Sequence, residues 1–209
     1  MERGRFITLE GGEGTGKSTL IAGLTTALRD RGISVIVTRE PGGTPLAEKI
    51  RELALNPPED HEWSPLAHAL LMNAAREDHL IRQIRPALAR GLWVICDRFA
   101  DSTRAYQSID GVPLSVLKSF ETAVVGETAP DLTLILDAAP EDLSERRRVR
   151  DVTDVFESKG MDFHGKVRAA FLAIAKQEPE RCKLIDAVLP ADIVLNRALV
   201  EIDQIVSLT

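Results

Sequence analysis

The stretch FITLEGGEGTGKSTL, residues 6–20, decides the fold and the first part of the chemistry. It opens with an apolar, β-branched run typical of a buried strand and ends in the apolar spacing of a helix. Between them, Gly11, Gly16, Lys17 and Ser18 satisfy the phosphate-loop pattern G-x4-G-K-[ST]. Glycines let successive backbone N–H groups point at phosphate oxygens, and the N-terminus of the following helix adds positive charge. The stretch therefore predicts a nucleotide-binding loop.

Each residue of this loop has an expected task. Lys17 would reach the β- and γ-phosphates of ATP, and the Ser18 hydroxyl would hold Mg²⁺. Glu13 is unexpected beside phosphates, where a carboxylate is tolerated only if a metal ion, an arginine or a hydroxyl donor compensates it. The predicted ATP-binding residues are Gly11, Gly12, Glu13, Gly14, Thr15, Gly16, Lys17, Ser18 and Thr19.

The rest of the chain alternates short β-branched runs with longer helical stretches. Strands are predicted at 5–10, 34–40, 92–97, 132–137 and 182–186. Helices are predicted at 17–30, 46–55, 64–84, around 114–126, from about 140 to 150, near 162–177 and from about 191. Five strands separated by helices imply an α/β fold, a parallel sheet flanked by helices on both faces. In such folds ligands bind beyond the carboxyl ends of the strands.

The composition narrows the class of protein. Of 209 residues, 44% are hydrophobic and 28% charged, so a single domain spanning 1–209 with a full-sized core is expected. A net charge of −6 argues against a general nucleic-acid or membrane-surface binder. Cys96 and Cys182 lack metal-ligand spacing and are predicted to be reduced core thiols. With no signal-peptide core or membrane-spanning run, a cytoplasmic location is expected.

Charged residues at the predicted strand ends favour transfer over hydrolysis. Hydrolytic ATPases commonly place a second carboxylate after the metal-linked Asp, whereas here Arg98 follows Asp97. Arginine neutralises phosphate charge and positions a second anion, but it cannot activate water as a base. Arg39 ends the preceding strand, and Arg76 lies in an otherwise apolar helix. Three arginines at predicted pocket positions indicate an acceptor that carries a phosphate.

Longer motifs resemble a known family. They are EGGEGTGKST (10–19), TREPGGTPLAEKIR (38–51), AAR (74–76), RPALARG (85–91), VICDRF (94–99), DSTRAYQ (101–107) and PDLTLILD (130–137). On these motifs the chain resembles the bacterial thymidylate kinases, which belong to the P-loop nucleoside monophosphate kinases, over nearly its whole length. The resemblance implies a fold of the P-loop NTP hydrolase type and a homodimeric protein. It also implies transfer of the γ-phosphate of ATP to dTMP with Mg²⁺, giving dTDP and ADP in dTTP biosynthesis.

The resemblance implies roles for individual residues. Arg39 and Arg98 match phosphate contacts, and Arg76 matches the arginine that hydrogen-bonds the thymine base. Asp97 matches the carboxylate that serves the metal and the acceptor, and Glu13 is expected to meet the sugar and metal-bound water. The remaining expected acceptor-binding residues are Pro41, Met72, Arg104, Tyr106 and Gln107.

A lid is expected at about 146–160, where four arginines occur within five residues. The phosphate loop itself carries no arginine, and a transition state with charge spread over phosphoryl oxygens needs a cation. By resemblance the lid supplies it, with Arg150 as the first candidate and Arg146 or Arg148 next. A charged helix end would also account for this run.

Three positions depart from the family pattern. Met72 stands where phenylalanine usually stacks on thymine, Val155 replaces an arginine after the lid, and SIDG (108–111) replaces a glycine-rich run. Two alternatives therefore stay open at this point. One keeps the fold but takes another nucleoside monophosphate such as dUMP. The other is a nucleotide-dependent switch that transfers nothing, against which the acceptor-side arginines speak.

Overall fold

Five parallel strands form the centre of the computed structural model, which describes residues 3–58, 61–143 and 160–207. The strands are β1 (Phe6–Gly11), β2 (Val35–Arg39), β3 (Trp93–Asp97), β4 (Leu132–Asp137) and β5 (Cys182–Asp186). Their order in the sheet is β2-β3-β1-β4-β5, so β1 is the middle strand and delivers the phosphate loop to the centre of one sheet edge. This arrangement confirms the predicted α/β fold class.

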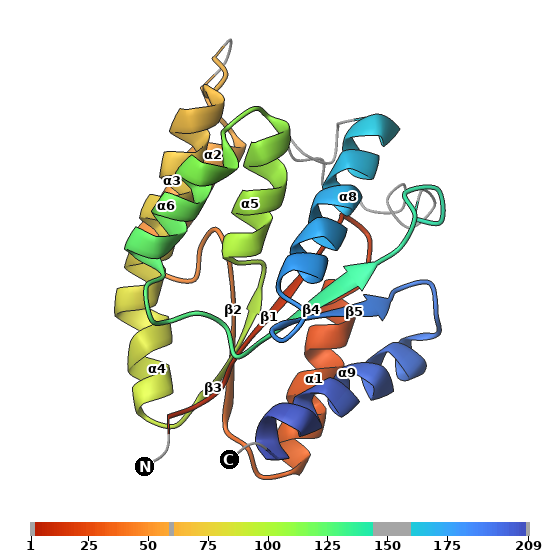
Figure 1. The fold of residues 1–209 in the computed structure, drawn as a ribbon. Helices are drawn as coiled ribbons and strands as arrows, with labels where there is room; N and C mark the ends of the chain where they lie inside the picture. The colour runs from red at the N-terminus through yellow and green to blue at the C-terminus, as the bar shows by residue number, and fades with distance from the viewer. Residues whose placement is uncertain (1–2, 59–60, 144–159, 208–209) are drawn as a thin grey trace.

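Helices cover both faces of the sheet (Figure 1). On one face, α1 (Lys17–Asp30) and α9 (Ala191–Ser207) lie side by side and share an apolar cluster with the strands. The opposite face carries α3 (Pro65–His79), α4 (Arg85–Ala89), α5 (Ala100–Ile109) and α8 (Met161–Gln177). Two further helices, α2 (Pro45–Leu55) and α6 (Leu114–Val124), pack on α3. No helix of the described residues is long and apolar enough to cross a membrane.

Strand alternation decides which side chains meet. Arg39 and Asp97 pair in register, and they share the parity of Val35 and Ile95, which pack on the α1 side of the sheet. Successive side chains of a strand point to opposite faces. Thr38, one residue earlier, therefore points to the α3 side.

The predicted helix at 64–84 is interrupted. It starts as expected, with the Ser64 side chain accepting from the Ala67 backbone N–H and Pro65 in the first turn. Residues Leu80–Ile84 form a wider π-helical turn before α4. Pro86 has no backbone N–H for the regular ladder, which accounts for the change of pitch there.

The helix α5 was missing from the sequence prediction. Its residues ADSTRAYQSI are mostly polar yet largely buried, so no apolar stripe marks the helix. The expected helix from about 140 to 150 falls largely on residues 144–159, which lie outside the described residues. Both cysteines are free and buried, as predicted.

Candidate active site

The phosphate loop joins β1 to α1 and uses glycine where the backbone demands it. Gly16 adopts a left-handed conformation with φ 92° directly before the helix. A Cβ on Gly11 would lie 2.4 Å from the Leu136 carbonyl oxygen, so only glycine fits there. The buried Lys17 ammonium donates to the carbonyls of Gly11, at 3.2 Å, and Gly12, at 3.0 Å. Burial, helped by the charge of Arg98, lowers the pKa of Lys17 to about 8.

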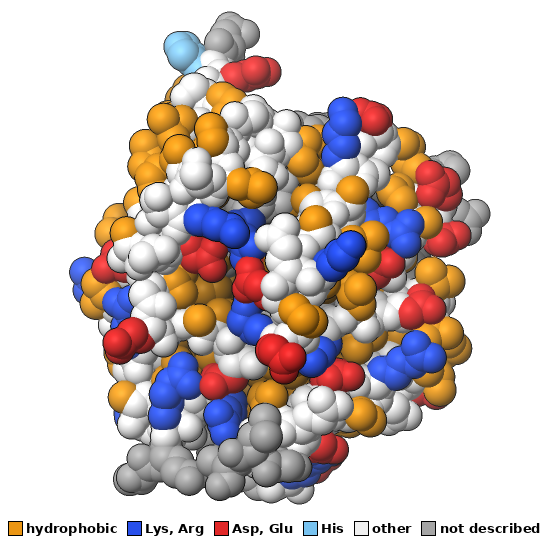
Figure 2. Space-filling model, in the orientation of Figure 1, with side chains coloured by type: hydrophobic (Ala, Val, Ile, Leu, Met, Phe, Trp, Pro, Cys, Tyr) orange, Lys and Arg blue, Asp and Glu red, His pale blue; other side chains and the backbone are white. Residues whose placement is uncertain are grey.

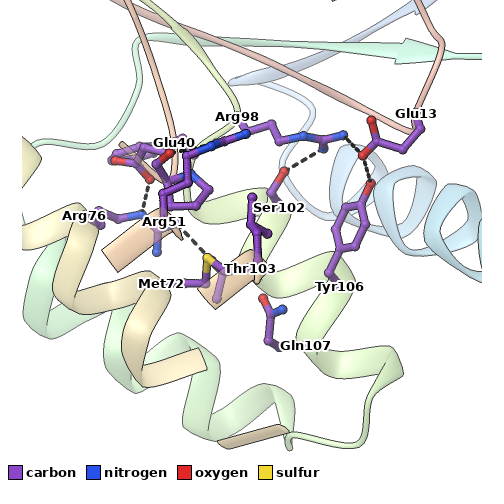
Figure 3. A pocket seen from close by; sticks show the side chains of 13 residues that line it. Glu13, Glu40, Arg51, Met72, Arg76, Arg98, Ser102, Thr103, Tyr106 and Gln107 are labelled. Carbon is purple, nitrogen blue, oxygen red and sulfur yellow. Dashed lines mark hydrogen bonds and ion pairs between the residues drawn. The ribbon is translucent and has the colours of Figure 1, made fainter. Parts of the chain in front are cut away.

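A separate cavity opens between this loop and the helices α2, α3 and α5 (Figure 3). The empty space among its lining side chains is about 560 Å³, including space that is open to solvent. Its lining residues are Glu13, Glu40, Pro41, Arg51, Leu55, Met72, Arg76, Arg98, Phe99, Ser102, Thr103, Tyr106 and Gln107. The loop and the cavity share Glu13, so the two compartments adjoin.

Arg98 and Glu13 form the boundary between loop and cavity. Arg98 has φ 68°, a left-handed conformation that turns its side chain back across the end of the sheet. Its guanidinium donates to the Gly11 carbonyl at 3.0 Å, to Ser102 Oγ at 3.1 Å and to the Glu13 carboxylate at 2.5 Å. In Figure 3, Tyr106 reaches the same carboxylate from α5, and its hydroxyl donates over 3.2 Å.

This pairing answers why an acidic residue belongs in the loop. Burial alone would raise the pKa of Glu13, but Arg98 and Lys17 outweigh it and hold the pKa at about 2. Glu13 is therefore ionised at neutral pH and holds Arg98 close to the phosphate loop. Its carboxylate balances two cations at a place built for phosphate.

Glu10, which was not predicted as a site residue, lies in β1 and holds the chain that follows Arg98. Its buried carboxylate accepts from the backbone N–H groups of Phe99, at 2.8 Å, and Ser102, at 3.1 Å, and from Ser102 Oγ at 2.6 Å. It thus caps the start of α5 from a neighbouring strand. Burial, with the nearby charge of Asp101 adding, raises the pKa of Glu10 to about 7.

Arg76 lies at the opposite end of the cavity. Its guanidinium donates to Glu40 Oε2 at 2.8 Å, to Asn73 Oδ1 at 3.2 Å and to Thr103 Oγ1 at 2.9 Å. It also packs over the Phe99 ring at 5.2 Å. Both Arg76 and Glu40 are only 3% exposed, so this is a buried ion pair that a bound ligand would meet already formed.

Asp97 and Ser18 line one groove on the α1 side of the sheet. Asp97 Oδ1 is buried and has no hydrogen-bond partner among the described residues. An orphaned carboxylate oxygen beside a hydroxyl fits Mg²⁺, which takes few protein ligands and completes its shell with phosphates and water. Within the described residues no group of three or more His, Cys, Asp or Glu side chains forms a metal cage, as expected for such a site.

Two residues that were expected to contact the acceptor, Arg39 and Arg104, do not line the cavity. Arg39 does not line the cavity: it is 56% exposed, pairs with Glu48 at 3.0 Å and lies in the groove with Asp97. Strand parity puts it on the wrong face of the sheet. Arg104 is buried on the side of α5 that faces away from the cavity, where it pairs with Asp101 at 3.1 Å and Glu178 at 2.5 Å, and it does not line the cavity either.

Arg51, which was not among the predicted site residues, lines the cavity where Arg39 does not. It projects from α2 into the cavity lining, and its guanidinium donates to the Pro41 carbonyl at 2.8 Å. Pro41, Met72, Tyr106 and Gln107, which are expected to bind the acceptor, line the cavity. A helical arginine at the end of the TREPGGTPLAEKIR motif was the available signal, but nothing in its spacing indicated the direction of its side chain.

A second groove flanks the phosphate loop, and sequence reasoning missed it too. Residues 187–191, between β5 and α9, face the loop and the first turns of α1 across an open space. Its side chains are mostly apolar, with Thr15 and Thr19 as polar ones, and polar atoms make up much of the remaining exposed lining. Such a surface suits the base of a nucleotide whose phosphates occupy the loop. The proposed lid arginines Arg146, Arg148 and Arg150, and Val155, lie outside the described residues.

Two adjoining sites, one built for phosphates and one for a second anion-bearing molecule, define a P-loop nucleoside monophosphate kinase. The family model described as thymidylate kinase matches residues 9–198, and the chain therefore belongs to the thymidylate kinase family. It is 55% identical to a thymidylate kinase of Caulobacter vibrioides over 188 residues, 90% of each chain.

Two further comparisons agree. The chain is 51% identical to a thymidylate kinase of Rhodopseudomonas palustris over 189 residues, covering 88% of this chain and 82% of the relative. Its structure matches a crystal structure of thymidylate kinase from Ehrlichia chaffeensis with a TM-score of 0.75 and 32% identity, covering 94% of this chain and 97% of that one.

Proposed function

We propose that this chain transfers the γ-phosphoryl group of ATP to dTMP, giving dTDP and ADP. Membership of the thymidylate kinase family supports this reaction. The observation that carries it in the structure is the Arg98–Glu13 pair, which joins the phosphate loop to the acceptor cavity. That junction is where a transferred group would pass between the two nucleotides.

The transfer is direct, with no covalent enzyme intermediate. An acceptor phosphate oxygen attacks the γ-phosphorus, and the bond to the β,γ-bridging oxygen breaks as ADP leaves. Lys17 exchanges its two loop carbonyls for phosphate oxygens, and Arg98 holds the acceptor phosphate in line. Hydrogen bonds hold both side chains at this junction before the substrates arrive, so Lys17 has only to exchange acceptors and Arg98 already lies beside the acceptor cavity.

The two substrates divide the site between them. ATP places its phosphates on the loop and its base in the groove beside residues 187–191. Mg²⁺, held by Ser18 and Asp97, would neutralise phosphate charge. dTMP places its phosphate at Arg98 and Arg51 and its base between Met72 and Arg76, with Pro41, Tyr106 and Gln107 around it. Glu13 faces the sugar and orients Arg98.

A lid at about 146–160 supplies a further cation in this proposal. Arg150, with Arg148 next, would meet the transferring phosphoryl group, since the phosphate loop carries no arginine of its own. Replacing both together should lower turnover well beyond about threefold, because a transition-state cation is worth far more than that. Turnover within that limit contradicts the lid proposal.

We also propose that the chain is a cytoplasmic, single-domain homodimer. The apolar side chains Leu66 and Leu70 of α3 and Leu114 at the start of α6 are about half exposed. These neighbouring helices form the outer wall of the molecule and offer a seam for a second copy (Figure 1). Leu70→Glu should shift the mass measured by light scattering from two chains to one, and an unchanged mass contradicts this seam.

We propose small-molecule rather than polymeric substrates, and the distribution of charge on one face of the molecule supports this. Figure 2 shows Lys and Arg side chains interspersed with Asp and Glu on this face of the described chain, rather than gathered into one basic patch. Binding to nucleic acid generally needs such a patch.

The experiment that tests the function is a coupled assay of ATP consumption across dTMP, dUMP, dCMP, dGMP and UMP. We expect the highest kcat/KM with dTMP. Preference for another acceptor would favour a kinase for a different nucleoside monophosphate. ATP hydrolysis that does not rise with any acceptor would favour a nucleotide-dependent switch.

A further inference from the structure

A buried chain of hydrogen bonds runs behind the acceptor cavity, from β2 through α3 to Arg76. Thr38 Oγ1 lies 2.7 Å from His79 Nε2, and His79 Nδ1 lies 3.0 Å from Glu40 Oε1. The other oxygen of the same carboxylate accepts from Arg76 Nε at 2.8 Å. Thr38, His79 and Glu40 lie outside every role assigned so far, although Glu40 lines the cavity.

The direction of these bonds follows from the chemistry of their atoms. An ionised carboxylate only accepts, so Nδ1 of His79 carries a proton and donates to Glu40. The Thr38 hydroxyl bonds the opposite ring nitrogen and so fixes the ring plane. His79 is fully buried, which leaves the ring no water to turn towards.

Gly43, the second glycine after Pro41, makes room for this histidine. A Cβ on Gly43, whose φ is +87°, would lie 2.4 Å from His79 Nε2 and 2.6 Å from Thr38 Oγ1. Even the smallest side chain would therefore push the ring from its place. The packing of His79 thus explains why the second glycine of this motif, Gly43, carries no side chain.

Arg76 is left with fixed, unused donors. Glu40, Asn73 and Thr103 take three of the five N–H groups of its guanidinium, leaving two for a ligand in the cavity. Asn73 is itself fixed, because its amide nitrogen donates to the Ala69 carbonyl at 2.8 Å and its oxygen therefore faces Arg76. The rotation of the planar guanidinium is therefore set by three acceptors, of which Glu40 is the one held by His79.

We propose that His79 is a positioning residue for base selection. Held by Thr38, it fixes the Glu40 carboxylate and, through it, the two free Arg76 donors that meet the acceptor base. The inference rests on the proposed role of Arg76 in reading that base. Arginine can only donate, so a donor aimed at position 4 of a pyrimidine accepts the carbonyl of thymine or uracil and rejects the amino group of cytosine.

The test compares acceptor ratios rather than rates. The ratio of kcat/KM for dTMP over dCMP reports the base edge at positions 3 and 4 together with the methyl group. The ratio for dTMP over dUMP reports the methyl group alone, so a change in the first ratio without a change in the second belongs to the base edge. Both ratios are independent of the fraction of active enzyme. In His79→Leu we expect the dTMP/dCMP ratio to fall about tenfold, because a charge-assisted hydrogen bond is misdirected. The dTMP/dUMP ratio should stay within about twofold.

Three other variants complete the design. His79→Asn keeps an N–H for Glu40 and should recover much of the dTMP/dCMP ratio. Thr38→Val removes the hydroxyl without changing shape, so it reports on the chain if His79→Leu does not fold, and we expect a loss of about threefold. His68→Leu removes another buried histidine near the start of α3 and should leave both ratios unchanged.

The outcomes distinguish the positioning role of His79 from the reading of the acceptor base by Arg76, on which it depends. Arg76→Lys keeps the charge beside Glu40 but loses the planar donors, and it should lower the dTMP/dCMP ratio. If it does while His79→Leu and Thr38→Val leave the ratio unchanged, the positioning role of His79 is wrong. If both ratios fall alike in His79→Leu, the residue supports the cavity generally and the inference is also wrong. An unchanged ratio in Arg76→Lys removes base reading by Arg76 itself.

Discussion

The two sides of the site are made by different parts of the chain. The donor side is largely backbone: glycines bend the loop, and Lys17 is held by two loop carbonyls at 3.2 and 3.0 Å. The acceptor side is made of side chains whose charges already neutralise one another, such as Arg76 with Glu40 and Arg98 with Glu13. A backbone cradle suits any nucleoside triphosphate, whereas a paired side-chain cavity can select one acceptor.

The largest expected effect falls on the donor side. Lys17→Ala should lower kcat by about 10²–10³-fold, because the variant loses a cation that meets the transferring phosphoryl group. If the two sides are separately built, dTMP affinity measured calorimetrically without ATP should stay within about twofold of wild type. A parallel loss of dTMP affinity would break the comparison.

Arg98 should affect the acceptor side almost as strongly. Arg98→Gln should lower kcat/KM for dTMP by about 10²-fold, since it removes a charged phosphate contact and leaves Glu13 without its main partner. Equilibrium binding of ATP should change far less, because the loop backbone remains. Equal losses for both nucleotides would show that Arg98 belongs to the donor side as much as to the acceptor side.

The ionisation of Glu10, beside the acceptor cavity, makes the stability of the folded chain depend on pH. Its pKa lies near 4.5 in the unfolded chain and about 7 in the folded one, so between these values the folded state holds a proton that the unfolded chain has lost. This contribution to stability is present below pH 4.5 and is lost as pH rises to 7. Glu10→Gln should therefore gain about 2–3 kcal/mol relative to wild type between pH 4.5 and 7.

Urea unfolding of both proteins at pH 5 and pH 7 measures that difference. Parallel pH dependence in wild type and variant would contradict a strongly raised pKa at Glu10. It would also mean that the Glu10 carboxylate, at the start of α5, is less buried than in this structure.

The smallest effects test the correction between two neighbouring arginines. Arg51→Ala should raise the KM for dTMP about tenfold, because Arg51 lines the cavity. Arg39→Ala should change it by less than about twofold, since an exposed ion pair contributes little. The increase in the steady-state KM for dTMP should therefore be larger in Arg51→Ala than in Arg39→Ala. A larger effect from Arg39 would restore the sequence-based assignment.

The same contrast explains what the sequence could predict. The donor side repeats a contiguous motif, Gly11 to Ser18, whose physics is local, so its placement at the end of β1 followed directly. The expectation for Arg39 came from its motif, which does not show the face of the sheet that its side chain takes. In the structure Arg39 shares a sheet face with Asp97 rather than with Thr38. Nothing in a linear sequence without strand pairing marks that difference.

The residues of the acceptor cavity were harder to predict from the sequence for a second reason. The helix α5 carries Ser102, Thr103 and Tyr106 towards the cavity and buries Arg104 on its other side. Polar residues on both faces remove the apolar period that predicts a helix. Glu10 and His79 were missed because a buried charge or ring becomes recognisable only through partners distant in sequence.

The central claim is that the acceptor side is formed before ATP arrives. Calorimetric titration of dTMP into the nucleotide-free protein tests it most directly. We expect wild type and Lys17→Ala to bind dTMP with equal affinity, and Arg76→Lys to bind it about tenfold more weakly. Binding of dTMP only after ATP or an unreactive ATP analogue has been added would contradict the claim.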